Sequence, residues 1–209
     1  MTHQAHGRLA SEGDWDDRYR ASDQIWSGQP NGALVAETAD QEPGRALDVG
    51  CGEGADAIWL ALRGWQVTAL DLSSVALDRA RAAATGAGVD IEWIHAGLLG
   101  ATLPARGFDL VTAHYPALLR TAAHEAEAAL LAAVAPGGTL LVVHHADVDM
   151  DEAKAQGFDP ADYVGPAEVL AAIDESWAIE VDETRPRAVP ASGAAHHVRD
   201  QVLRARRPA

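Results

Sequence analysis

The sequence has little cysteine, few basic side chains and no long apolar stretch. Its single cysteine, Cys51, excludes an internal disulfide and favours a reducing compartment. No run of about 18 apolar residues occurs, so no transmembrane helix is expected. Residues 1–17 lack the basic start and the apolar stretch of a secretory signal. Together these absences predict a cytoplasmic protein that contacts no membrane.

Positive charge is scarce. Sixteen Lys and Arg side chains stand against 31 Asp and Glu, which gives a formal net charge of −15. A surface this acidic repels nucleic-acid backbones and anionic lipids, so neither is expected as a partner. The apolar fraction of 48% over 209 residues is enough for one well-packed core and predicts a single domain spanning residues 1–209.

Short apolar runs alternate with segments of helical periodicity. This alternation is typical of a doubly wound α/β domain with a mostly parallel, Rossmann-like sheet and helices on both faces. Near the C-terminus two further runs, separated by a loop rich in Pro, Ala and Ser, predict an antiparallel hairpin on the sheet edge. The seven expected strands cover residues 45–50, 65–72, 90–96, 107–115, 139–146, 176–187 and 194–207.

A glycine-rich turn, "DVGCGEGAD", follows the first expected strand. Gly50 and Gly52 permit a tight turn and bring backbone N–H groups close to a ligand, and Gly54 lets the next helix approach the strand. Asp71 ends the second expected strand, where a carboxylate can accept hydrogen bonds from both ribose hydroxyls. In doubly wound sheets these positions meet at the ligand-binding edge, so the sequence predicts a site for a nucleoside cofactor.

The glycine spacing differs from that of dinucleotide-binding proteins. The turn reads G-x-G-x-G rather than G-x-G-x-x-G, and Asp48 stands two residues before the first glycine. Negative charge at this place disfavours a pyrophosphate and suits a ligand with a positive amino group. An NAD(P)-dependent oxidoreductase is therefore a weaker alternative.

The stretch "LDVGCGEGADAIWLALRGWQVTALDLSSVALDRAR" resembles the cofactor half of class I S-adenosylmethionine-dependent methyltransferases. Within that class it is most similar to small-molecule enzymes such as the thiopurine, thiol and tellurite-resistance methyltransferases. The motifs "IWSGQPN", "GFDLVTAHY" and "VAPGGTLLVV" also fit. The resemblance implies an N-terminal helical cover over residues 1–42, a cofactor-binding half over 43–146, and a substrate-side lid with the C-terminal hairpin over 147–209.

The resemblance also implies where S-adenosylmethionine, and its product S-adenosylhomocysteine, would bind. Asp48 would lie near the amino group of the cofactor, Asp71 would bind the ribose hydroxyls, and Leu72 would pack on the adenine. The aspartate that often binds the adenine amino group is missing from "HAGLLG", so the backbone at Gly97 and Leu98 is expected to replace it. The remaining implied cofactor contacts are Trp26, Asn31, Gly50, Cys51, Gly52, Gly54 and His114.

Residues at the ends of the fourth and fifth expected strands are the catalytic candidates. His114 and Tyr115 close the fourth strand, and His144 and His145 end the fifth, where a histidine could act as general base. Because side chains alternate across a strand, at most one histidine of the pair should face the pocket. Adjacent histidines on a strand point apart and no third ligand is evident, so no metal is expected.

The expected reaction is methyl transfer to a small molecule. A chain of this length leaves few residues outside the cofactor fold, which favours a small acceptor. A thiol sulfur is favoured because it is partly ionised near neutral pH, with a pKa of about 8.5. Oxygen and nitrogen acceptors stay open, as does a non-catalytic protein that only binds the cofactor or its product.

The predicted cofactor can be tested by thermal unfolding with S-adenosylhomocysteine and NAD in parallel. A ligand at a hundred times its Kd adds about 2.7 kcal/mol of stability. For a chain of this size that raises Tm by roughly 5–10 °C. We expect this rise with S-adenosylhomocysteine, its loss in Asp71→Ala, and no rise with NAD. A rise with NAD alone would contradict the cofactor assignment.

Overall fold

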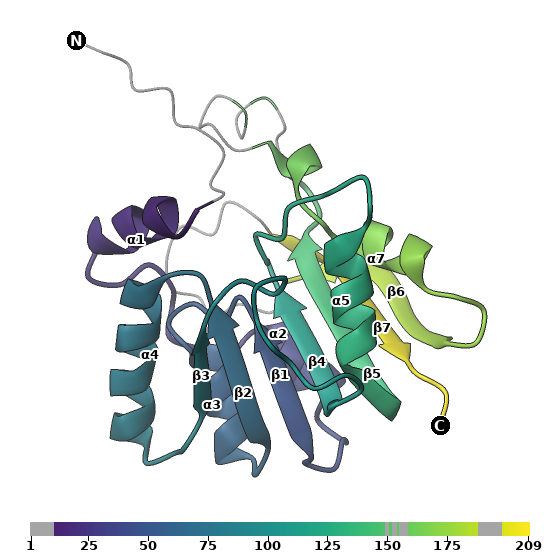
Figure 1. The fold of residues 1–209 in the computed structure, drawn as a ribbon, viewed down its shortest axis with the longest axis horizontal. Helices are drawn as coiled ribbons and strands as arrows, with labels where there is room; N and C mark the ends of the chain where they lie inside the picture. The colour runs from purple at the N-terminus through teal and green to yellow at the C-terminus, as the bar shows by residue number, and fades with distance from the viewer. Residues whose placement is uncertain (1–10, 149–150, 152–153, 155–158, 188–197) are drawn as a thin grey trace.

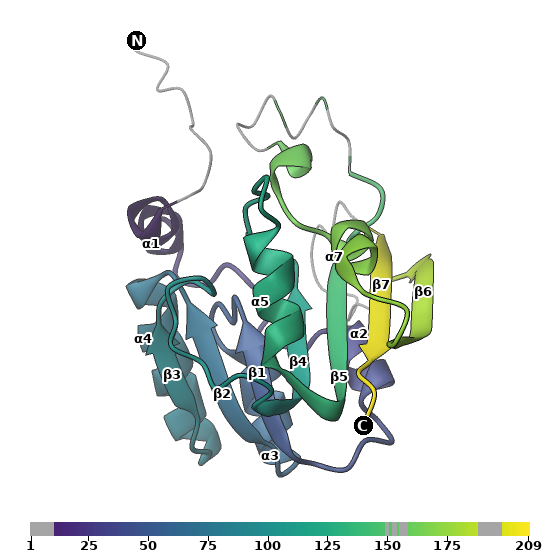
Figure 2. The same ribbon diagram turned by 45° about the vertical axis from the view of Figure 1, so that its right-hand side comes forward.

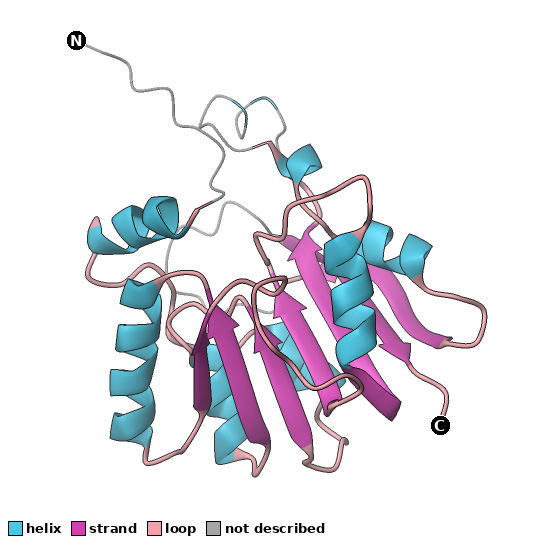
Figure 3. Cartoon of the chain, viewed as in Figure 1, coloured by secondary structure: helices cyan, strands magenta, loops and turns pink. Residues whose placement is uncertain are grey.

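The computed structural model describes residues 11–148, 151, 154, 159–187 and 198–209. Its centre is one seven-stranded sheet with the order β3-β2-β1-β4-β5-β7-β6 (Figures 1 and 3). β1 to β5 are parallel where they pair, and β7 is antiparallel to both β5 and β6. The predicted doubly wound, mostly parallel sheet with a C-terminal antiparallel hairpin is confirmed. The strands are β1 (Arg45–Val49), β2 (Gln66–Asp71), β3 (Glu92–His95), β4 (Phe108–His114), β5 (Val134–His145), β6 (Ala178–Pro186) and β7 (Arg199–Arg206).

Helices cover both faces of this sheet (Figure 2). α5 and α7 pack on one face, and α2 and α3 on the other. α4 contacts β2 and β3, and α1 lies across the N-terminal end of α4 (Figure 1). The helices are α1 (Glu12–Arg20), α2 (Gly32–Glu37), α3 (Ala55–Leu62), α4 (Ser74–Ala87), α5 (Glu125–Ala133) and α7 (Pro166–Ala172), with a 3-10 turn at Pro160–Asp162.

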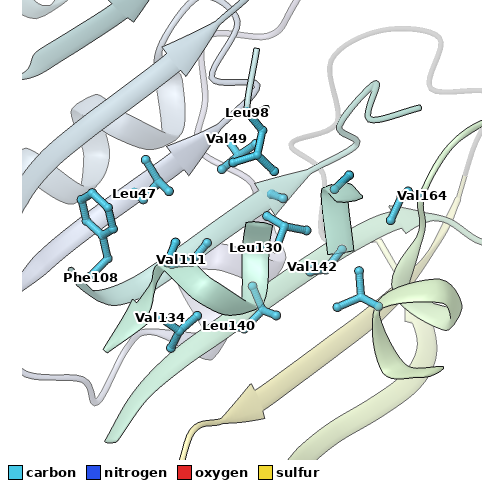
Figure 4. Packing of buried hydrophobic residues seen from close by; sticks show 14 of the residues in the cluster. Leu47, Val49, Leu98, Phe108, Val111, Leu130, Val134, Leu140, Val142 and Val164 are labelled. Carbon is cyan, nitrogen blue, oxygen red and sulfur yellow. The ribbon is translucent and has the colours of Figure 1, made fainter. Parts of the chain in front are cut away.

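The central strands are apolar on both faces, which is why they read as continuous apolar runs in the sequence. In β5, Leu140 and Val142 point into the cluster beneath α5 and α7, part of which is drawn in Figure 4. Their neighbours Leu141 and Val143 point into the opposite cluster beneath α2 and α3. All four side chains are fully buried. Burying side chains of this size stabilises the fold by about 1.5–3 kcal/mol each.

The boundary between α5 and β5 differs from the sequence-based expectation. The fifth strand was expected to start at residue 139, whereas α5 ends at Ala133 and β5 begins at Val134. Pro136 explains the difference, because proline disfavours helical backbone in the residue before it and donates no N–H. The strand starts here with an irregular register, pairing Val134 with Phe108 and then Thr139 with Leu110.

Ion pairs fasten α2 to the C-terminal hairpin. Glu37, at the end of α2, is 8% exposed. Its Oε1 lies 2.6 Å from Nη1 of Arg185 in β6, and its Oε2 lies 2.9 Å from Nη1 of Arg204 in β7. Both oxygens of this buried carboxylate are therefore partnered, as burial of a charge requires. The two pairs fix α2 against strands that follow it by about 150 residues.

Two glycines with left-handed backbone allow a matched stability test. At Gly54 (φ 84°) a Cβ would come within 2.9 Å of both Ala80 Cβ and Trp93 Cη2. At Gly88 (φ 70°) a Cβ would meet nothing within 4 Å. Gly88→Ala should cost about 1 kcal/mol, the backbone penalty alone. Gly54→Ala should cost about 2–4 kcal/mol, because overpacking adds about 1–3 kcal/mol. Urea unfolding measures both, and equal losses would contradict the crowding at Gly54.

Candidate functional site

The glycine-rich turn lies at the carboxyl ends of the parallel strands, beside the point where the strand order reverses between β1 and β4. Gly50, Gly52 and Gly54 all have left-handed backbone, with φ of 72°, 52° and 84°. The N–H groups of Gly50 and Cys51 donate to the carbonyl of Leu70 at 2.9 and 3.0 Å. The turn is thus built on backbone that favours glycine and is tied directly to β2.

Asp71 joins the turn to the end of β2. Its Oδ2 accepts from the Gly52 N–H and its Oδ1 from the Ser73 N–H, both at 2.8 Å. Burial raises the pKa of Asp71, against the lowering effect of these two N–H groups. Each carboxylate oxygen has a further lone pair, so the group can still accept the ribose hydroxyls that the sequence predicted for it.

Asp48 is a buried carboxyl group with spare binding capacity. It is 2% exposed, and its Oδ2 has no hydrogen-bond partner among the described residues. Burial raises its pKa well above the usual value, and the negative charges of Asp56 and Asp71 add to this effect. A cationic ligand group would stabilise its charged form. A buried carboxyl with one unpartnered oxygen beside the turn therefore fits the ammonium group of S-adenosylmethionine.

Two aromatic residues from the N-terminal segment lie over Gly52. A Cβ at Gly52 would be 2.9 Å from Tyr19 Oη and 3.2 Å from Trp26 Nε1. Trp26 Nε1 itself donates to Tyr19 Oη at 3.0 Å. Tyr19 is 3% exposed, whereas Trp26 is 47% exposed. The structure places Trp26 at the turn, as predicted, and adds Tyr19, which the sequence did not single out.

Glu53 connects the turn with the described part of the N-terminal cover, residues 11–42. Its carboxylate accepts from the N–H groups of Ile25 and Trp26. It also pairs with Arg79 Nη1 at 2.8 Å, and Arg79 in turn donates to the carbonyl of Tyr19. The acidic side chain in the middle of the glycine motif thus holds the cover in place.

Asp16 of α1 caps the N-terminal end of α4. Its carboxylate accepts from the hydroxyls of Ser73 and Ser74 and from the Val75 N–H. Burial alone would raise the pKa of Asp16, but these hydrogen bonds, together with Arg20, lower it to about 2. Because the folded-state pKa of Asp16 is lowered, its ionised carboxylate stabilises the folded protein fully above the usual pKa of 3.8. This contribution to stability is lost as the pH falls through about 2.

Asn31 and Asp56 connect the cover to β4. Asn31 is the N-cap of α2, and its backbone N–H donates to Asp56 Oδ1 at 2.6 Å. The other oxygen of Asp56 lies 3.0 Å from Nδ1 of His114. The His114 side chain is 5% exposed, and Nδ1 also lies 2.9 Å from the Thr112 hydroxyl. The sequence predicted Asn31 and His114 separately, and Asp56 brings them together.

The predicted adenine region lies at the end of β2. A Cβ at Gly97 would be 3.1 Å from Leu72 Cδ2, so the glycine leaves room for this leucine. The Leu98 side chain is 4% exposed and belongs to the core cluster beneath α5 and α7. Leu72 and Gly97 are therefore neighbours, and any contact of Leu98 with a ligand would come from its backbone.

The four catalytic candidates come together at the ends of β4 and β5. The Tyr115 ring stacks on His145, with centroids 4.2 Å apart and planes at 21°, and meets His144 edge-on at 6.3 Å. The Tyr115 hydroxyl donates to Asp200 of β7 at 2.9 Å. His114 precedes Tyr115 in the chain. The sequence located this cluster but missed Asp200, because 85 residues separate it from Tyr115.

Other features bear less on the chemistry. Burial and the charge of Asp48 raise the pKa of the Cys51 thiol, which disfavours a reactive thiolate.

Among the described residues no three His, Cys, Asp or Glu side chains gather as metal ligands, and no helix is long and apolar enough to cross a membrane. A groove of about 670 Å³, lined by Arg45, Gln66 and Glu92 among others, lies at the amino ends of the strands, away from the glycine turn.

The fold and the glycine turn with Asp48 and Asp71 define an α/β protein with a candidate site for a nucleoside cofactor. Residues 46–138 match the profile of the methyltransferase domain family. An uncharacterized methyltransferase of Mycobacterium tuberculosis (strain ATCC 25618 / H37Rv) is 43% identical over 101 residues, which are 46% of this chain. The match spans 48%, about half, of the length of that relative.

Solved structures match over nearly the whole chain. A structure described as the conversion of a disulfide bond into a thioacetal group during echinomycin biosynthesis is 26% identical, with a TM-score of 0.73, over 94% of this chain and 92% of the other. The N-methyltransferase NodS from Bradyrhizobium japonicum WM9, in complex with S-adenosylhomocysteine, is 19% identical and shares the fold with a TM-score of 0.70, over 96% and 100%. The chain thus contains a segment, residues 46–138, that is similar to the methyltransferase domain family, within a fold that it shares with NodS. The predicted fold is confirmed, and the match of residues 46–138 agrees with the predicted family and cofactor.

The contribution of the cover to cofactor binding can be tested at Asp16. Asp16→Asn weakens hydrogen bonds to a charged group, each worth about 1.5–3 kcal/mol. If the cover closes over the cofactor, the Kd for S-adenosylhomocysteine should rise about tenfold or more by calorimetry. Asp17→Asn is the matched control, because that side chain is 83% exposed and pairs with Arg20. Equal Kd values for the two variants would show that docking of α1 does not assist binding.

Proposed function

We propose that this protein transfers the methyl group of S-adenosylmethionine to a small-molecule acceptor, with a thiol sulfur as the favoured nucleophile. The observation that carries the proposal is the pairing of Asp48, buried with an unpartnered oxygen, with Asp71 at the glycine turn. Together they provide places for an ammonium group and for ribose hydroxyls. When bound, the cofactor supplies a methyl group on a sulfonium, which is already activated for transfer.

The residues of the chain have three tasks in this reaction. Asp48, Asp71 and the turn would bind the cofactor, while Tyr19 and Trp26 over Gly52 would exclude water from its methionine end. Holding the acceptor in line can lower the barrier by as much as about 7–11 kcal/mol in well-oriented systems. The cluster of His114, Tyr115, His144 and His145 would face the acceptor and assist loss of its proton.

A similar solved structure, the acidity of thiols and the rings around Tyr115 support a small sulfur acceptor. The structure at 26% identity and 94% coverage is described in terms of disulfide and thioacetal chemistry, which takes place at sulfur. A thiol also needs less help from a base than a phenol does, because its pKa is about 8.5 rather than about 10. The ring system around Tyr115 provides contacts suited to a small, partly apolar acceptor.

Turnover with a panel of acceptors tests the proposal. The purified protein is incubated with S-adenosylmethionine and 2-mercaptoethanol, benzyl mercaptan or thiophenol, and with phenol and aniline for comparison. We expect S-adenosylhomocysteine to form fastest with a thiol and its formation to be lost in Asp71→Ala. Faster turnover of phenol or aniline would reassign the acceptor. Cofactor binding without turnover of any compound would favour a non-catalytic binding protein.

A further inference from the structure

A phenol and a carboxylate meet at the acceptor side of the site. Tyr115 follows β4 directly, and Asp200 is the second residue of β7, antiparallel to β5. The Tyr115 hydroxyl donates to Asp200 Oδ1 at 2.9 Å. Asp200 is only 3% exposed, so this hydrogen bond lies within the protein. A buried carboxylate bonded to a phenol at a strand end is unusual enough to require a reason.

The Tyr115 hydroxyl has one hydrogen-bonding position left. A phenolic oxygen has one proton to donate and two lone pairs to accept with. The proton goes to Asp200. The Asn31 side chain, which lowers the pKa of Tyr115, takes up at most one of the two lone pairs. The second lone pair can therefore accept the proton of an acceptor molecule.

The position of Tyr115 is fixed at an energetic cost. Its φ of 50° lies in the left-handed region, which is uncommon for a non-glycine residue and frequent at functional sites. Its N–H donates to the Val143 carbonyl at 2.8 Å, its ring stacks on His145, and the Arg187 guanidinium lies 4.7 Å from the ring centroid. The surrounding strands thus hold the hydroxyl at one place.

Tyr115 alone is a poor base. Burial raises its pKa well above the usual range, against the lowering effect of Arg187, and Asp200 raises it further. The phenol therefore stays protonated near neutral pH. It can take up a proton only if it passes its own proton on. Asp200 is placed to receive it, because burial raises the pKa of that carboxyl although Tyr115, Arg187, His114 and Arg185 oppose the effect.

We propose that Asp200 is the final proton acceptor of the methyl-transfer reaction and acts through Tyr115. This inference rests on the proposed function. As the S–H proton of the acceptor moves to Tyr115 Oη, the Tyr115 proton moves to Asp200 Oδ1. The acceptor sulfur keeps its electron pair and forms the new bond to the methyl carbon. The old bond from that carbon to the donor sulfur breaks, and its electron pair stays on the donor sulfur.

The kinetic test compares Asp200→Asn, Tyr115→Phe and the double variant with the same three thiols. Loss of general base catalysis typically costs about 10²–10⁴-fold. We expect each single variant to lose about a hundredfold in kcat at pH 7 with 2-mercaptoethanol and benzyl mercaptan, and far less with thiophenol, which is more acidic and already largely thiolate at this pH. The double variant should lose no more than either, because the two residues act as one unit. The loss should shrink to within about threefold above the pKa of the thiol, where the thiolate needs no base.

Controls separate this role from a structural one. Asp182→Asn changes the same charge in the same hairpin at an exposed position and should keep the wild-type pH profile. All variants should keep the rise of Tm with S-adenosylhomocysteine. A loss in Asp200→Asn that is equal at every pH, or additive losses in the double variant, would overturn the relay. If wild-type protein methylates no thiol, the sulfur-acceptor function fails first.

A titration without turnover gives an independent readout. The chain has three tyrosines, so the ultraviolet absorbance change on ionisation can be assigned to Tyr115 by comparison with Tyr115→Phe. Because Asp200 raises the pKa of Tyr115, Asp200→Asn should shift this ionisation to lower pH. An unshifted titration would show that the two groups are not coupled, and the proposal would fall even if thiols are methylated.

Discussion

The burial of several carboxyl groups at one end of the sheet is the constraint on which the site depends. Asp48 and Asp71 lie next to the glycine turn, and burial raises the pKa of both because desolvation disfavours the charged form; the negative charge of Asp71 raises the pKa of Asp48 further. Backbone N–H groups satisfy Asp71, while one oxygen of Asp48 has no partner among the described residues. Such an arrangement favours a cationic ligand and disfavours a pyrophosphate. The charge of the site therefore supports the proposed cofactor more sharply than the shape of the glycine turn does.

The N-terminal cover is held by residues that serve the cofactor region at the same time. Glu53 belongs to the glycine turn yet accepts from the backbone of Ile25 and Trp26. Asp16 caps α4, the helix that begins directly after Asp71. Because each anchor lies within a few residues of a predicted cofactor contact, the cover and the turn are parts of one hydrogen-bonded unit.

Much of the fold could be predicted from the sequence, since the parallel strands are apolar runs and the turn needs glycine at left-handed positions. Gly52 and Asp71 were identifiable from their spacing, and the structure joins them by a hydrogen bond. Tyr19 and Asp200 were not identifiable, because their roles arise from tertiary contacts with residues far away in the chain. The early start of β5 was missed because the alanine-rich stretch before Pro136 has high helix propensity, which the proline overrides.

The ion pairs of Glu37 have a consequence for how the two halves of the reaction are linked. Through Arg185 and Arg204 they attach α2 to the hairpin that carries Asp200, while the N-cap of the same helix, Asn31, bonds Asp56 and Tyr115. α2 therefore connects the hairpin with the residues around the glycine turn. A shift of the hairpin would reach Asn31 and Asp56 through this helix, so the proposed acceptor side and the proposed cofactor side of the site are mechanically coupled.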